Sequence, residues 1–320
     1  MDIQAHPQLE TVPLSTTTHR KRRMRDIRSG GSAPYLFILP FGLLFVLFFL
    51  VPIGYAFYQS LFSLQRSGLG LGAAQSVFSG LRNYGDVLKD GKFLESVVRM
   101  LLFGVVQIPI MLGLALVLAL LLDSGVARLR AFFRLAYFVP YAIPGIVGAL
   151  LWSFLYVPQF SPIVKGLAAL HLGPPDFLGP NTILWSIVNI VTWEFVGYNM
   201  LIIFAALQAI PSDTYEAARI DGCTGWKVAR YIKIPLVAPT LVLTGVLSII
   251  GTLQLFNEPA VLQSISNNIT SSYTPNLYAY YIAFNENNFN YTAALAVVLA
   301  LVTFVFSFGF LRLTRRYSGV

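Results

Sequence analysis

The sequence has few charged residues, a single cysteine and three histidines. Asp, Glu, Lys and Arg make up only 11% of the 320 residues, whereas soluble domains average about 25%. Cys223 alone permits no internal disulfide, and the scattered histidines lack the spacing of a metal site. The sequence contains no GxxxxGK[ST] segment, no evident nucleophile and no evident acid pair. We therefore predict no catalytic residue, no metal site and no ATP site in this chain.

Apolar residues dominate instead. They make up 56% of the chain, and they form runs of more than 18 residues, each long enough to cross ~30 Å of hydrocarbon as a helix. We therefore predict an all-α membrane protein that spans the cytoplasmic membrane, in contact with lipid, with six transmembrane helices. The expected segments are Tyr35–Phe62, Ser96–Leu122, Phe132–Tyr156, Ile183–Ile210, Leu236–Phe256 and Tyr291–Leu313.

The basic residues indicate the orientation. The net charge is +8, but the basic residues cluster at the ends of apolar segments, which argues against nucleic-acid binding. Residues 1–32 contain the run HRKRRMRDIR and are predicted to form a disordered cytoplasmic tail, followed by a membrane domain over 33–320. Sixteen of the 22 Lys and Arg residues fall on the side of both termini. That side is expected to be cytoplasmic.

A polar, basic stretch from 211 to 239 separates two apolar segments. Asp213 is expected to cap a short helix, with Glu216 as its partner in a capping box. Gly222 suits the left-handed position that ends a helix. A second short amphipathic piece is expected over Trp226–Ile234. The stretch is therefore predicted to be a folded helix–turn–helix and not a bare connector.

This stretch resembles the EAA loop of the permease subunits of binding-protein-dependent ABC importers. The motif is EAA, three residues, G, nine residues and I-x-L-P. Two positions depart from it, since Ile234 replaces Leu and Cys223 replaces a small Ala. The segments GLRNY at 80–84, GYNML at 197–201 and LQAIP at 207–211 resemble the first permease of maltose-type carbohydrate importers. The resemblance implies the type I importer permease fold, with coupling to an ATPase through Glu216, Ala217, Ala218, Asp221, Gly222, Ile232 and Pro235.

The resemblance also implies a function and a set of partners. The chain would be the permease subunit of an ATP-driven importer that translocates a carbohydrate of the di- or oligosaccharide kind, without bond chemistry of its own. It would form a heterodimer with a second permease, and two ATPase subunits would bind ATP and Mg. An extracytoplasmic sugar-binding protein would meet the outer loops, expected at 63–95, 157–182 and 257–290.

Polar residues stand inside two of the apolar segments. A carboxylate such as Glu194 costs ~2.5–3.5 kcal/mol at the centre of a membrane, so it should face protein or water. These side chains fit either helix packing or hydrogen bonding to a polar solute. In maltose-type permeases the sugar site lies at mid-membrane, and Trp193, Tyr198 and Ser248 have like residues there. Other positions of that site differ in this sequence, at Val191, Phe195, Gly251 and Thr252. The candidate substrate-binding residues are Trp193, Glu194, Tyr198, Asn199, Ser248, Thr252 and Gln254.

Two questions stay open at this point. Pro140, Pro144 and Gly145 interrupt the third segment, and a tolerated kink is favoured over a bend beside a translocation path. A stand-alone secondary transporter or channel is the alternative function, although only Glu194 is a mid-span charge and no repeat is evident. The sequence does not identify the sugar, nor whether this subunit contacts it.

Overall fold

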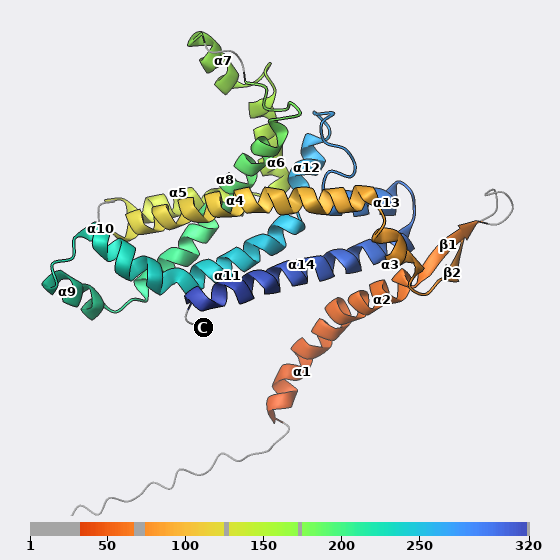
Figure 1. Cartoon of the computed structure of the whole chain (residues 1–320), viewed down its shortest axis with the longest axis horizontal. Helices are drawn as coiled ribbons and strands as arrows, with labels where there is room; N and C mark the ends of the chain where they lie inside the picture. The colour runs from red at the N-terminus through yellow and green to blue at the C-terminus, as the bar shows by residue number, and fades with distance from the viewer. Residues whose placement is uncertain (1–32, 67–73, 125–127, 172–174, 319–320) are drawn as a thin grey trace, which may run out of the picture. The chain divides into compact units, whose positions relative to one another are not determined.

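The computed structural model describes residues 33–66, 74–124, 128–171 and 175–318, and they are mostly helical (Figure 1). The tail predicted over 1–32 lies outside the described residues. The chain divides into one compact unit up to Val51 and a second from Pro52 onward. In the first unit, α1 (Ala33–Phe45) is followed by a π-helical turn, η1 (Val46–Leu50). Apolar side chains surround this helix and are exposed on every side, as befits contact with lipid.

Two π-helical turns precede prolines at the same spacing. η1 ends two residues before Pro52 in α2 (Val51–Ser60), and η2 (Ala229–Lys233) ends two residues before Pro235 in α11 (Ile234–Leu253). Proline lacks an N–H and its ring crowds the carbonyl four residues back. A turn with bonds to the fifth residue back, such as Val51 N–H to the Val46 carbonyl, accommodates it without ending the helix.

The second unit continues from α2 into a β-hairpin that the sequence did not predict. Strand β1 (Phe62–Arg66) pairs antiparallel with β2 (Ala74–Phe78), with Phe62 opposite Phe78. A short helix, α3 (Arg82–Val87), follows the hairpin and leads into the long α4 (Gly91–Asp123). The hairpin and α3 lie at one end of this unit, opposite the loop that contains α9 (Ser212–Ile220) (Figure 1).

Four long helices form the body of this unit. Helices α4, α8 (Ile183–Gln208), α11 and α14 (Phe289–Ser318) pack against one another. Helix α8 is the most buried of the membrane-spanning helices because α4, α5 and α11 all contact it. Small residues bring the helices close together: a Cβ placed on Gly104 of α4 would lie 3.3 Å from Thr252 Cγ2 on α11.

The third predicted segment is a broken span. Helices α5 (Arg130–Ala142) and α6 (Gly145–Tyr156) meet at 96°, so the tolerated kink favoured from the sequence was wrong. Ile143 is extended, with ψ 134°, because the residue before a proline avoids the helical region. Pro144 then starts α6 in a new direction. Gly197 of α8 lets α5 approach closely, since a Cβ there would lie 1.7 Å from the Tyr137 carbonyl oxygen.

The prediction of six spans is confirmed. In the described residues, five helices are long and apolar enough to cross a membrane, and the α5–α6 pair supplies a sixth. One boundary was wrong: the short piece expected at Trp226–Ile234 is not separate from the fifth span. Helix α10 (Gly225–Val228), η2 and α11 run on without a break. The remaining short helices are α7 (Pro162–Ala169), α12 (Asn257–Leu262) and α13 (Pro275–Phe284).

Candidate functional site

The EAA loop forms the predicted helix–turn–helix, but its first cap differs from the expectation. Helix α9 begins at Ser212, directly after Pro211, and no side chain caps it. The predicted capping box between Asp213 and Glu216 was therefore wrong. Because the helix starts two residues earlier than expected, Asp213 lies within its first turn. A carboxylate there still favours the helix through the positive end of the helix dipole.

The end of α9 follows the prediction for Gly222. Its φ is +73°, a left-handed conformation that glycine adopts without strain. The N–H of Gly222 donates to the Arg219 carbonyl at 3.0 Å, and the N–H of Cys223 donates to the Ala218 carbonyl at 2.9 Å. These two bonds form a Schellman motif. The motif fixes the direction in which the chain leaves α9 and enters α10.

The loop presents apolar side chains outward. Ile220, Trp226 and Tyr231 are 87%, 75% and 71% exposed, respectively. Of the residues assigned to coupling, Ala218 is buried, whereas Glu216 and Gly222 are exposed. Large exposed apolar groups beside polar residues are typical of a protein-binding surface. The remaining coupling residues Ala217, Asp221 and Pro235 are exposed as well, and Ile232 is half-buried.

A partly buried polar cluster connects this loop to the ends of the spans. Lys233 at the start of α11 forms an ion pair with Asp123 at the end of α4. Gln208 at the end of α8 donates to Asp123 Oδ1 at 2.6 Å. Lys233 also lies 5.3 Å from the ring centre of Tyr215 in α9. Burial, with the nearby charge of Asp123, raises the pKa of the Tyr215 hydroxyl. The cluster links α4, α8, α9 and α11.

A cavity of about 220 Å³ lies among α4, α8, α11 and α12. Five of the seven predicted substrate residues line it: Tyr198, Asn199, Ser248, Thr252 and Gln254. Two non-adjacent segments of the sequence, before and after the EAA loop, thus contribute to one wall. Tyr198 also stacks on Tyr141 of α5, with ring centres 4.4 Å apart.

Further polar residues line the same cavity and were not predicted: Gln107, Asn257 and Glu258. Gln107 is 1% exposed, and its amide donates to the thioether of Met111 at 3.3 Å. The amide of Asn199 donates to the same sulfur at 3.6 Å and to the Phe195 carbonyl at 2.9 Å. A thioether is a weak acceptor. Gln107 therefore has a weak partner that a solute hydroxyl could replace.

The structure places the other two predicted residues outside the lining of this cavity. Trp193 packs edge-on against Trp152 of α6, with ring centres 5.8 Å apart. Glu194 is directed toward the break between α5 and α6, where a Cβ on Gly145 would lie 3.1 Å from its Oε1. Its Oε2 is buried without a hydrogen-bond donor. Glu194 therefore stands behind the cavity wall that Glu258 forms.

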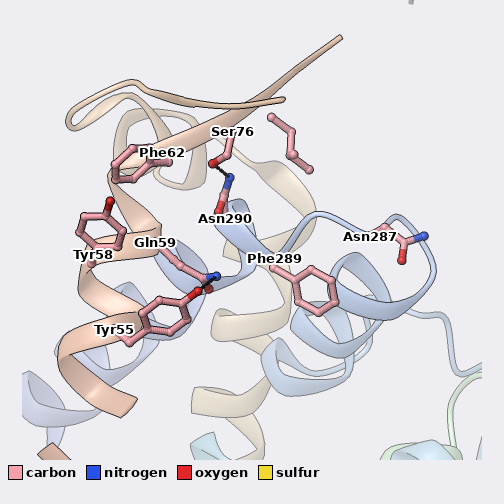
Figure 2. A pocket seen from close by; sticks show the side chains of 9 residues that line it. Tyr55, Tyr58, Gln59, Phe62, Ser76, Asn287, Phe289 and Asn290 are labelled. Carbon is pink, nitrogen blue, oxygen red and sulfur yellow. Dashed lines mark hydrogen bonds between the residues drawn. The ribbon is translucent and has the colours of Figure 1, made fainter. Parts of the chain in front are cut away.

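A second cavity, of about 420 Å³, lies beside the β-hairpin (Figure 2). Tyr55, Tyr58 and Gln59 of α2 form one side, and residues around the start of α14 form the other. Asn290 donates to Ser76 Oγ at 2.8 Å across it. Tyr55 and Tyr58 are more than half exposed at the end of a span. That position is typical of tyrosines at a membrane–water interface, so the inner cavity is the stronger candidate for solute binding.

A helical protein that spans the membrane six times, with a polar cavity between its helices and a folded loop at one end, belongs to the class of membrane transport subunits. Residues 91–319 match the family model of binding-protein-dependent transport system inner membrane components. The chain belongs to this family and is a multi-pass permease subunit of an ABC importer. The family predicted from the EAA loop is thus confirmed, and the stand-alone transporter is not supported.

Individual relatives agree with this family. The lactose transport system permease protein LacF of Rhizobium radiobacter is 33% identical over 91% of this chain and 96% of its own length. The arabinooligosaccharides transport system permease protein AraP of Bacillus subtilis (strain 168) is 31% identical over 97% of both chains. The sn-glycerol-3-phosphate transport system permease protein UgpA of Agrobacterium fabrum is 32% identical over 86% of this chain and 94% of its own.

A solved structure shares the fold. A chain in the crystal structure of a bacterial ABC transporter that imports the acidic polysaccharide alginate superposes with a TM-score of 0.74. It is 19% identical in sequence, and the alignment covers 89% of this chain and 95% of that chain. The predicted type I importer permease fold is therefore confirmed.

Proposed function

We propose that this chain is one of two permease subunits through which an ABC importer moves a di- or oligosaccharide across the cytoplasmic membrane. The observation that carries the proposal is the inner cavity, where Tyr198, Asn199 and Ser248 meet between membrane-spanning helices. Its amide and hydroxyl groups suit the hydroxyl groups of a sugar, and its aromatic rings suit the apolar faces. The relatives named for lactose and arabinooligosaccharides support a carbohydrate.

The cavity wall in this chain is incomplete by itself. Its volume of about 220 Å³ lies below the ~300–1,000 Å³ that is common for ligand pockets. We propose that a second, different permease supplies the rest of the wall in a heterodimer. Trp193 and Glu194 do not line the cavity. We therefore propose that both residues act on the solute through the neighbouring residues that do line it.

The EAA loop is the proposed contact with the ATPase. Glu216 offers a charge partner, Ala217 permits close approach, and the exposed Ile220 and Trp226 offer apolar area. Two ATPase subunits would carry ATP and Mg, and their closure would move α9 and α10. The partly buried cluster around Asp123 would pass that motion to the ends of α4 and α8. In this orientation the loop and both termini are cytoplasmic.

An extracytoplasmic sugar-binding protein is the proposed partner on the opposite side. The loops expected on that side contain the β-hairpin, α7 and α13. One of the solved structures that share this fold is a complex with an alginate pentasaccharide-bound periplasmic protein, which supports this kind of partner. The relatives named for lactose and for sn-glycerol-3-phosphate leave the charge of the solute undecided.

The test is reconstitution of this chain with its partner subunits, followed by sugar-stimulated ATP hydrolysis and uptake across a panel of sugars. We expect stimulation by at least one di- or oligosaccharide together with its binding protein. Tyr198→Ala should lower uptake per assembled complex and spare basal ATP hydrolysis. Tyr35→Ala, which removes a ring that is 78% exposed on α1, is the matched control. Normal uptake per complex in Tyr198→Ala would instead assign Tyr198 to helix packing.

A further inference from the structure

One acidic side chain distinguishes the lining of the inner cavity. Among the described residues that form it, Glu258 is the only Asp, Glu, Lys, Arg or His. Glu258 is 4% exposed and lies at the second position of α12. The other lining residues that carry polar side chains are neutral amides and hydroxyls. The described wall therefore offers an anionic solute no positive partner.

Glu258 does not stand alone. Its carboxyl group lies beside the carboxyl group of Glu194 on α8, and both face Gly145 of α6. A Cβ placed on Gly145 would lie 3.0 Å from Asn257 Nδ2, 3.1 Å from Glu194 Oε1 and 3.7 Å from Glu258 Oε1. The two carboxyl groups and the amide thus meet at the first residue of α6, where only a glycine leaves enough room.

This arrangement retains negative charge. Two carboxyl groups this close do not both ionise, so they hold one proton between them and the pair as a whole keeps one negative charge. The pair lies at the N-terminus of the 12-residue helix α6, where the helix dipole favours a negative charge. Glu194 is 6% exposed, and its buried Oε2 has no hydrogen-bond partner.

We propose that the Glu194–Glu258 pair makes the inner cavity select against anionic solutes, so that it accepts neutral or amine-bearing carbohydrates and rejects uronates and phosphorylated sugars. This inference rests on the proposed function and specifies its substrate class. Glu258 would accept hydrogen bonds from solute hydroxyl groups, and Glu194 acts as the residue that positions it. A carboxylate or phosphate on the solute would meet a like charge in a partly desolvated site, and such juxtapositions are an effective way to exclude a competitor.

The chain offers a clear test with matched solutes. The whole complex, in lipid nanodiscs and without the binding protein, is titrated calorimetrically with α-1,4-galactobiose and digalacturonate, and with cellobiose and cellobiouronate. Carboxyl groups replace both hydroxymethyl groups in digalacturonate and one of the two in cellobiouronate. We expect the neutral member of at least one pair to bind at least ~tenfold more tightly, which corresponds to ~1.4 kcal/mol.

Substitutions distinguish the role of the Glu194 carboxyl group from that of the Glu258 carboxyl group. Glu194→Gln leaves the charge on Glu258 and supplies a donor, so it should keep the discrimination. Glu194→Gln combined with Glu258→Gln removes the charge and should reduce the discrimination to less than ~twofold, since the like-charge repulsion is gone. Glu286→Gln, at an exposed carboxyl group before α14, is the control and should behave as wild type.

The outcomes distinguish this inference from the proposed function. Equal or tighter binding of the acidic sugars by the wild type, or unchanged discrimination in the double variant, overturns charge selection and leaves carbohydrate import standing. If no sugar binds the complex but sugar uptake with the binding protein is normal, the cavity is not the sugar site and this inference fails. Absence of both binding and uptake for every sugar contradicts the proposed function itself.

Discussion

Lys233, the last residue of the π-helical turn before α11, forms an ion pair with Asp123, the last residue of α4. The two side chains are only 14% and 8% exposed. The pair joins residues 110 positions apart in the sequence, and Gln208 of α8 completes it through a hydrogen bond to Asp123. Three helix ends are therefore held together where the EAA loop enters the membrane domain.

Asp123→Ala should strongly destabilise the protein. It leaves the Lys233 cation with little solvent and no partner, and breaking one side of a buried ion pair costs ~3–5 kcal/mol. Replacing both partners, as in Asp123→Leu with Lys233→Met, should recover most of the loss, because apolar groups can fill the site. Thermal unfolding and the yield of assembled complex measure both effects.

The control for this prediction is an exposed ion pair. Asp86→Ala breaks the exposed pair with Arg82 and should change little. A wild-type unfolding midpoint for Asp123→Ala would contradict this view of the pair.

Gly197→Ala should separate α5 from α8. The added Cβ would lie 1.7 Å from the Tyr137 carbonyl oxygen, so the backbone of one helix must move. We expect a lower unfolding midpoint and less protein in the membrane. Gly113→Ala on α4 is the control, since a Cβ there meets no atom within 4 Å. It should be neutral or stabilising by up to ~1 kcal/mol. Equal unfolding midpoints for the two variants would show that α5 can move away from α8 without loss of stability.

Cysteine labelling should establish the orientation of the chain. The excess of Lys and Arg on the side of the EAA loop predicts that this side is cytoplasmic. In a Cys223→Ser background, Thr224→Cys should be protected from an impermeant thiol reagent in intact cells. Gln159→Cys and Asn267→Cys, at exposed positions beyond the opposite ends of the spans, should be labelled. Labelling of Thr224→Cys from outside, with protection of the other two, would reverse the orientation and the proposed ATPase contact.

Much of the fold follows from sequence patterns. Long apolar runs locate the membrane helices because hydrocarbon excludes any unpaired backbone. The EAA spacing locates the helix–turn–helix, including the left-handed Gly222. The 96° break between α5 and α6 was not predicted, because prolines in a span are compatible with either a kink or a break. The break forms because Ile143, directly before Pro144, is extended and so ends α5.

The candidate site was only partly predictable. Tyr198 and Ser248 could be proposed because polar groups inside apolar segments are conspicuous. Glu258 was missed because it follows the fifth apolar segment, in a stretch expected to be an outer loop. Its pairing with Glu194 depends on how α12 packs against α6 and α8, which residue spacing does not encode. Trp193 was a candidate substrate-binding residue, but the structure shows that it packs against Trp152, outside the lining of the cavity.

The last prediction concerns coupling, and it relies on the left-handed conformation of Gly222. Gly222→Asn should keep the turn, because Asn tolerates this conformation better than other residues with a side chain. Gly222→Asp adds a side chain of similar size that also carries a negative charge. Gly222 is exposed where the ATPase is proposed to bind. A desolvated, unpaired charge in that contact costs far more than a neutral amide.

We therefore expect Gly222→Asn to retain partial uptake and co-purification with the ATPase. Gly222→Asp should reach the membrane in similar amounts but lose both. Glu216→Ala, which removes an exposed charge without altering the turn, should weaken co-purification to a lesser degree. Uptake, co-purification and membrane abundance are measured for each variant. Wild-type uptake in Gly222→Asp would rule out a close ATPase contact at this turn, whereas equal loss in Asn and Asp variants would assign the effect to backbone strain.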